Sequence, residues 1–234
     1  MEEKLHIEQQ LLSVNGQIAT AKQKAGREDE VRLLLATKTV EPERIKMAIA
    51  AGATLIGENK VQEYQQKAEA LKDIVCERHF IGHLQTNKVK EILKYVTCIQ
   101  SVDRLGLAEK LQTQLEHLDK HLDIYIQINT SGEESKSGVA PEQAFSLMEK
   151  IAGLPRLKVK GLMTIGLFSD EEIPVRKSYS LLREFREKGQ RQGLLPVGHL
   201  ELSMGMSGDI DWAIQEGSTM VRVGSAVFGK RHYQ

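Results

Sequence analysis

Lys38 is the residue whose type and position most directly suggest covalent chemistry. It stands at the end of an apolar run, residues 33–39, that we expect to form the first buried strand. An ammonium group at the edge of a buried strand loses hydration, which favours the neutral amine that forms an imine with an aldehyde. Taken by itself, the residue is more readily explained as a side chain that extends into the solvent.

Two clusters of small and hydroxylated residues, 202–209 and 221–226, indicate binding of a phosphate group. Glycine lets backbone N–H groups approach an anion, and serine adds hydroxyl donors. Each cluster alone is equally well explained by turns and by a helix cap at Ser207 or Asp209. Two clusters in adjacent loops favour phosphate.

Arg222 precedes the second cluster inside a strand-like run, so we expect its guanidinium to be partly buried and to need an acceptor. A ring nitrogen of a ligand is one such acceptor, because arginine donates without giving up its own proton. A salt bridge with Glu201 on the neighbouring strand is the alternative, and spacing alone favours it.

Histidines four residues apart do not predict a metal site here. His79 and His83 lie on an expected strand and turn, where this spacing does not converge on one ion. His117 and His121 have no obvious third ligand.

Short apolar runs alternate with amphipathic stretches from residue 31 to residue 229, which is typical of β/α units around a parallel sheet. We expect eight strands, at residues 32–38, 54–58, 78–82, 97–101, 123–129, 157–164, 199–203 and 220–223. We expect helices at residues 2–25, 42–51, 60–72, 85–95, 104–118, 141–153, 174–192 and 207–216, and a last turn at 226–232.

Eight such repeats in 234 residues fit a closed (β/α)8 barrel of the TIM type better than an open doubly wound sheet. The expected strand-to-helix turns also contain no G-x-G-x-x-G sequence of the dinucleotide-binding kind. No linker interrupts the pattern, so we expect a single domain over residues 1–234, with an extra N-terminal helix in 1–27 and the barrel in 31–229.

The composition excludes several kinds of partner. Lysine plus arginine and aspartate plus glutamate number 32 each, so no bulk charge attracts nucleic acid or an anionic membrane. The polar first residues precede no long apolar run, and we expect no membrane span. Cys76 and Cys98 have no metal-ligand or C-x-x-C spacing, so we interpret them as reduced thiols of a cytoplasmic protein.

Seven collinear motifs resemble the pyridoxal phosphate homeostasis protein family, also called YggS-like or PROSC-like. They are LATKT (35–39), GENKVQE (57–63), HFIGHLQTNK (79–88), SKSG (135–138), GLM (161–163), LSMGMS (202–207) and GSTMVRVGSAVFG (217–229). The resemblance implies a pyridoxal 5'-phosphate (PLP) protein of fold type III, a barrel similar to the N-terminal domain of alanine racemase.

The resemblance also implies roles for particular residues. Lys38 corresponds to the residue that forms the internal aldimine with PLP, and Arg222 to the partner of the pyridine nitrogen. The expected phosphate cradle is Ser203, Gly205, Gly224 and Ser225, and the expected lining of the ring pocket is Asn59 and Met163. Ser225 replaces the threonine of many relatives and retains the hydroxyl, whereas His83 replaces a frequent proline.

A function in PLP homeostasis follows from this resemblance, namely storage, buffering and delivery of PLP with little or no turnover. Racemisation in similar enzymes needs a tyrosine from a second, C-terminal domain, whereas this sequence ends at Gln234, just after the last motif. We expect a monomer whose partners are PLP and apo forms of PLP-dependent enzymes. The alternatives are a single-base PLP enzyme such as an amino-acid racemase, and a barrel that binds another phosphorylated metabolite.

Overall fold

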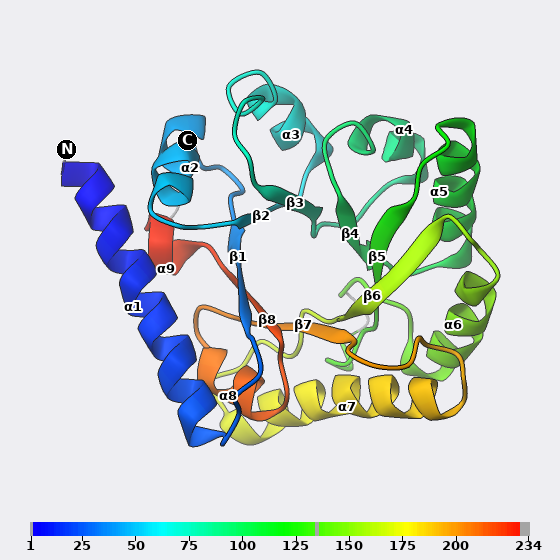
Figure 1. Cartoon of the computed structure of the whole chain (residues 1–234). Coiled ribbons are helices and arrows are strands. Elements are labelled where there is room, and N and C mark those ends of the chain that lie inside the picture. Colours follow the sequence, from blue (N-terminus) through cyan, green and yellow to red (C-terminus); the bar gives the residue numbers. More distant parts are fainter. Residues whose placement is uncertain (1, 134–135, 230–234) are drawn as a thin grey trace.

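The computed structural model describes residues 2–133 and 136–229. Its eight strands are parallel and close into a barrel, because each pairs with the next and β8 pairs with β1. The predicted (β/α)8 barrel is therefore confirmed (Figure 1). The strands are β1 (Arg32–Ala36), β2 (Leu55–Glu58), β3 (Glu77–Phe80), β4 (Cys98–Val102), β5 (Leu122–Gln127), β6 (Leu157–Met163), β7 (Glu201–Met206) and β8 (Met220–Val223).

Helices surround the barrel, and the expected N-terminal helix precedes it (Figure 1). The helices are α1 (Glu2–Lys24), α2 (Pro42–Ala50), α3 (Val61–Lys67), α4 (Val89–Ile92), α5 (Leu105–His117), α6 (Ala144–Ala152), α7 (Glu172–Arg191), α8 (Ile210–Gln215) and α9 (Ser225–Phe228). Short 3-10 turns precede α4 and α6, at Thr86–Lys88 and Pro141–Gln143. Residues 230–232 of the expected last turn, and Ser135 of the SKSG motif, lie outside the described residues. None of the helices in the described ranges combines the length and apolar character that crossing a bilayer requires.

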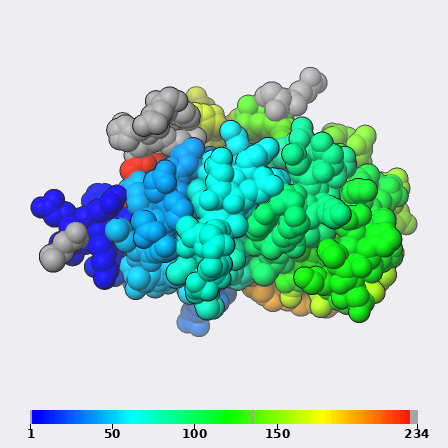
Figure 2. Space-filling view, turned by 90° about the horizontal axis from the view of Figure 1, so that it is seen from above, coloured from blue at the N-terminus to red at the C-terminus, as the bar shows by residue number. Residues whose placement is uncertain are grey.

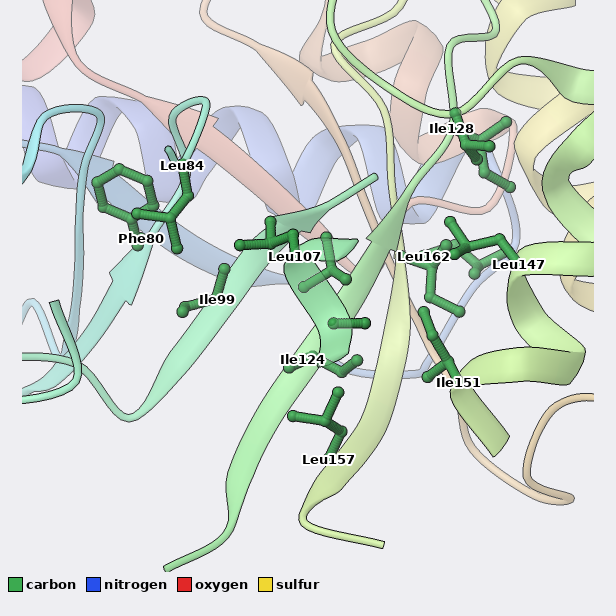
Figure 3. Close-up of a cluster of buried hydrophobic side chains, with 14 of the residues drawn as sticks. Phe80, Leu84, Ile99, Leu107, Ile124, Ile128, Leu147, Ile151, Leu157 and Leu162 are labelled. Atoms are coloured by element: carbon green, nitrogen blue, oxygen red, sulfur yellow. The ribbon is translucent and has the colours of Figure 1, made fainter. Parts of the chain in front are cut away.

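Most of the hydrophobic core lies between the outer face of the barrel and its helices. The larger of two outer clusters joins β3 to β7 with the helices that cover them, and Figure 3 shows part of it, from Phe80 in β3 to Leu162 in β6. The second joins β1 and β8 with α1, α2, α8 and α9. Viewed from above, the chain passes from α1 at one end of the molecule through α2 and α3 towards the green segments (Figure 2).

Successive side chains of each strand point alternately out of and into the barrel. In β8, Val221 and Val223 belong to the outer core, whereas Met220 packs in the interior cluster. Arg222, between the two valines, contacts interior groups. The interior is therefore only partly apolar, which leaves room for a polar network below the mouth of the barrel.

The expected end of the seventh strand is wrong. β7 ends at Met206 and not at residue 203, so Ser203 and Gly205 lie within the strand rather than in the following loop. The pairing of β7 with β8 shifts register between Ser203 and Met206, and Gly205 adopts a φ of 95° there. Gly205 was expected to form a turn, but its positive φ instead allows the change of register inside the strand.

We expect Gly205→Ala to lower the free energy of unfolding by about 2 kcal/mol, because the new side chain would be overpacked and its backbone strained. A Cβ atom at this position would lie 2.4 Å from Cβ of Ala213 in α8. Urea unfolding followed by circular dichroism measures the change. Gly208→Ala is the matched control, because a Cβ atom there has no neighbour within 4 Å. Equal stability of the two variants would contradict this interpretation.

Candidate functional site

A cavity of about 620 Å³ opens at the C-terminal ends of the strands. This is the end at which barrels of this kind carry their chemistry. Residues that follow β1, β2, β3, β7 and β8 contribute to its wall. Five of the eight sequence-predicted site residues line it, namely Lys38, Asn59, Arg222, Gly224 and Ser225.

Lys38 and Asn59 lie just beyond the ends of β1 and β2. Lys38 is half-buried in a turn, and Oδ1 of Asn59 is buried without a hydrogen-bond partner among the described residues. An unsatisfied buried acceptor is unfavourable unless a ligand or water donates to it. Gly82 packs tightly behind this position, because a Cβ atom there would lie 2.0 Å from the backbone oxygen of Asn59.

Gly224 and Ser225 line the cavity where β8 passes into α9. A Cβ atom on Gly224 would lie 2.9 Å from the backbone oxygen of Ala36, so glycine allows β8 to lie close to the end of β1. The first N–H groups of a helix have no partners within that helix, and Ser225 begins α9. Ser207 and Gly208 line the same cavity. Hydroxyl and N–H donors therefore gather at one wall.

Arg222 is 7% exposed, and its guanidinium is held by two neutral oxygen atoms. Nη1 donates a hydrogen bond of 2.8 Å to Oγ of Ser203, and Nη2 donates one of 2.7 Å to the backbone oxygen of Thr164. Desolvation lowers the pKa of Arg222, while the charges of Tyr179 and Asp209 oppose this shift. The side chain is therefore a fixed, buried donor that borders the cavity.

A chain of hydrogen bonds leads from Arg222 through the barrel interior to Glu77. Oγ of Ser203 donates to Oε1 of Gln100 at 2.6 Å, and Nε2 of Gln100 lies 2.7 Å from Nδ1 of His79. Because an amide nitrogen only donates, Nδ1 accepts, and neutral His79 carries its proton on Nε2, which lies 2.6 Å from Oε1 of Glu77. Each group in the chain donates towards Glu77. Because the hydroxyl hydrogen of Ser203 is directed at Gln100, its oxygen is left to accept from Arg222.

The salt bridge that spacing favoured between Arg222 and Glu201 is wrong. Met206, and not Glu201, is the residue of β7 that pairs with Arg222 in the sheet. Glu201 lies at the other end of β7, where Nη1 of Arg32 approaches it to 3.4 Å, and Arg32 also pairs with Glu77. The ion pairs of Arg32 with Glu77 and Glu201 thus lie at the floor of the barrel, away from the cavity.

Met163, Ser203 and Gly205 are not among the described residues that line the cavity. Met163 packs in the interior cluster, Ser203 is fully buried beside Arg222, and Gly205 lies against Ala213. Direct contact of these three residues with a ligand stays a prediction.

Sequence reasoning missed Gln100 and the actual role of Asp209. Gln100 lies in the middle of the buried strand β4, and a polar residue at such a position is the signal that could have identified it. Asp209 does precede α8, but Oδ1 accepts from the N–H of Met206 at 2.6 Å and Oδ2 accepts from the hydroxyl of Tyr179 at 2.8 Å. It thereby fixes the end of β7 at the cavity.

Comparison with known proteins defines first the class and then the family. The family model described as "Alanine racemase, N-terminal domain" matches residues 12–232, so the chain is a barrel protein of this class. A pyridoxal phosphate homeostasis protein of Aquifex aeolicus is 44% identical over 226 residues, which cover 96% of this chain and 98% of that protein. The chain belongs to the family of pyridoxal phosphate homeostasis proteins.

Two solved structures are similar to this one. The crystal structure of an unknown protein from Bifidobacterium adolescentis has a TM-score of 0.92 and 40% identity, and the match covers 97% of this chain and 96% of that one. PipY of Synechococcus elongatus, solved with PLP bound, has a TM-score of 0.83 and 30% identity, and the match covers 95% of this chain and 100% of that one.

Glu77 gives a pH dependence of stability that reports on the hydrogen-bond chain. The hydrogen bond with His79 is the largest of the effects that lower the pKa of Glu77 from 4.5 to about 2; the ion pair with Arg32 adds to it, and desolvation opposes it. A pKa lowered by folding stabilises the protein above the unfolded value and ceases to do so as the pH falls through the folded value. We expect the stability difference between wild type and Glu77→Gln to be constant above about pH 5 and to vanish as the pH approaches about 2.

Urea midpoints measured across this pH range test the expectation, with Glu149→Gln on the exposed side of α6 as the control. A difference for Glu77→Gln that did not change over the range would contradict it.

Proposed function

We propose that the cavity binds PLP and that the protein contributes to PLP homeostasis by storing, buffering and delivering it. One observation carries the proposal: an amine, Lys38, and a buried guanidinium, Arg222, line the same cavity. The family's shared naming and the PLP bound to PipY support it.

The groups at the cavity fit those that PLP presents, which are an aldehyde, a phosphate, a phenolic hydroxyl and a ring nitrogen. The unsatisfied Oδ1 of Asn59 accepts a hydrogen bond from a ligand hydroxyl. Gly224 leaves room at the point where a side chain would collide with Ala36. Ser225 and the start of α9 supply donors to the phosphate.

Lys38 holds the ligand covalently in this proposal. Its neutral amine attacks the aldehyde carbon, the carbonyl oxygen leaves as water, and a carbon–nitrogen double bond remains. Gly224 and Ser225 hold the phosphate, while Asn59 and Met163 border the ring. Ser203 acts by holding Arg222, and Gly205 by allowing α8 to approach β7.

Arg222 donates a hydrogen bond to the ring nitrogen, which stays unprotonated because arginine does not give up its proton. PLP supplies an electron sink when it is bound, and an unprotonated ring is a weaker one. We therefore propose little or no turnover of amino acids. The protein would act in the cytoplasm as a monomer of one domain, residues 1–234, and release PLP to apo forms of PLP-dependent enzymes.

We expect wild-type protein incubated with PLP to absorb near the visible range and, after borohydride reduction, to gain the mass of one reduced PLP on Lys38. Lys38→Ala removes the nucleophile and should lose both signals. Intact mass spectrometry with peptide mapping is the measurement. Lys60→Ala, an exposed lysine beside the cavity residue Asn59, is the control and should label as wild type does.

An adduct that persisted in Lys38→Ala would disprove the covalent role of Lys38. A colourless protein indifferent to PLP would favour a barrel for another phosphorylated metabolite.

We expect Arg222→Glu, in protein that retains PLP, to shift the absorbance maximum and to raise the exchange of the Cα proton of L-alanine in deuterated water, because a carboxylate favours ring protonation. Wild-type protein should exchange little. Nuclear magnetic resonance measures the exchange, and Arg191→Glu, exposed at the end of α7, is the control. Fast exchange with inversion in wild type would favour an amino-acid racemase instead.

A further inference from the structure

Lys67, the last residue of α3, is a second buried cation close to the site. Its side chain is 8% exposed, and Nζ has three acceptors. It lies 2.7 Å from Oε1 of Glu58, 2.7 Å from Oε2 of Glu63 and 2.9 Å from the backbone oxygen of Thr37. Because the three hydrogen bonds of this nitrogen are directed at protein oxygens, it is not placed to act as the nucleophile of the site.

The partners of Lys67 contact both neighbours of Lys38. The hydroxyl of Thr37 donates to Oε1 of Glu58 at 2.7 Å, in addition to the contact of its backbone oxygen with Lys67. The backbone N–H of Thr39 donates to Oε2 of Glu63 at 3.0 Å. The three charged side chains thus hold the turn on each side of Lys38. We call Glu58, Glu63 and Lys67 the buried ion cluster.

The turn that carries Lys38 is strained and needs such support. Thr39 has a φ of 62°, a left-handed conformation that is unfavourable for a β-branched residue. It persists only where surrounding contacts determine it. The hydrogen bond from Thr39 to Glu63 is one such contact, and Glu63 is in turn held by Lys67.

Burying these charged groups costs desolvation free energy, so the cluster is not an efficient way to stabilise the fold. Glu58 is 1% exposed, and desolvation raises its pKa even though the charge and hydrogen bond of Lys67 act against this. Well-packed apolar residues of similar volume are often as stabilising as a buried ion pair. Here the cluster binds backbone atoms on either side of Lys38, and apolar side chains could not replace these hydrogen bonds.

We propose that Lys67 is a positioning residue for Lys38: through Glu63 and Thr37 it fixes the strained turn so that the amine of Lys38 meets the aldehyde of PLP. This inference rests on the proposed function of Lys38. Lys67 is not among the described residues that line the cavity.

The test compares two ligands that differ only in the reacting group. Pyridoxine 5'-phosphate carries an alcohol where PLP carries the aldehyde, so it binds without a covalent bond. In Lys67→Met we expect the Kd for PLP to rise about tenfold, the size of effect expected for a lost hydrogen bond to a charged group. The Kd for pyridoxine 5'-phosphate should change less than about twofold, because the phosphate and ring contacts remain.

Two further variants keep the test decisive if Lys67→Met does not fold. Glu63→Gln retains an oxygen that accepts from Thr39, whereas Glu63→Leu does not, so only Glu63→Leu should weaken PLP selectively. Lys72→Met is the matched control, because Lys72 is an exposed lysine of the same segment that pairs only with exposed Glu69 among the described partners.

Equal weakening of both ligands, or unchanged PLP affinity in folded variants, would overturn the positioning role of Lys67. In a Lys38→Ala background the selective effect should disappear, and its persistence there would also overturn the role. Failure of wild-type protein to form the borohydride-trapped adduct would instead show that the proposed function itself is wrong.

Discussion

One constraint determines much of the barrel interior: the buried guanidinium of Arg222 must have hydrogen-bond acceptors. Because the side chain of Arg222 is buried away from water, its N–H groups need acceptors, and the surrounding strands provide them. Ser203 is one acceptor, and its own hydroxyl is committed to Gln100, which is committed to His79. A polar column therefore replaces part of the apolar filling usual in such barrels. It connects the mouth, where the ligand is proposed to bind, with the ion pairs of the floor.

Two buried cations, Arg222 at the wall of the cavity and Lys67 behind the turn that carries Lys38, have partners that differ in kind. Lys67 is neutralised by the carboxylates of Glu58 and Glu63. The direct hydrogen-bond partners of Arg222 are a hydroxyl and a backbone carbonyl, both uncharged. The charge of Lys67 is thus compensated within its own cluster, whereas Arg222 borders the cavity with no carboxylate among its direct hydrogen-bond partners in the described residues. Because of this difference, Lys67 is suited to holding the backbone in place, and Arg222 is suited to contacting a ligand.

The barrel and much of its mouth could be predicted because both follow from local patterns. Alternating apolar runs and helical stretches indicated eight β/α units, and the ends of parallel strands necessarily converge, which brought Lys38, Asn59 and Gly224 to one cavity. The partners of Arg222 could not be predicted, because they depend on register. Ser203 pairs with Met220, so Glu201 lies too far back along β7 to reach Arg222, and the irregularity at Gly205 brings Met206 to its side. Lys67 was equally hidden, since a lysine four residues after Glu63 resembles an ordinary surface pair until the helix is placed against the barrel.

The packing of α1 has a consequence for the order in which this chain acquires its shape. The buried side of α1, which includes Ile7, Leu11 and Val14, packs in one cluster with residues of α8 and α9. A ribosome releases α1 and α2 well before those two helices, so the part of α1 that α8 and α9 cover lacks these partners until both have been synthesised. The pairing of β1 with β8, which closes the barrel, likewise requires that β8 has been synthesised. Until then, part of the apolar side of α1 stays exposed on the nascent chain, and exposed apolar surface of this kind is what makes chaperones necessary.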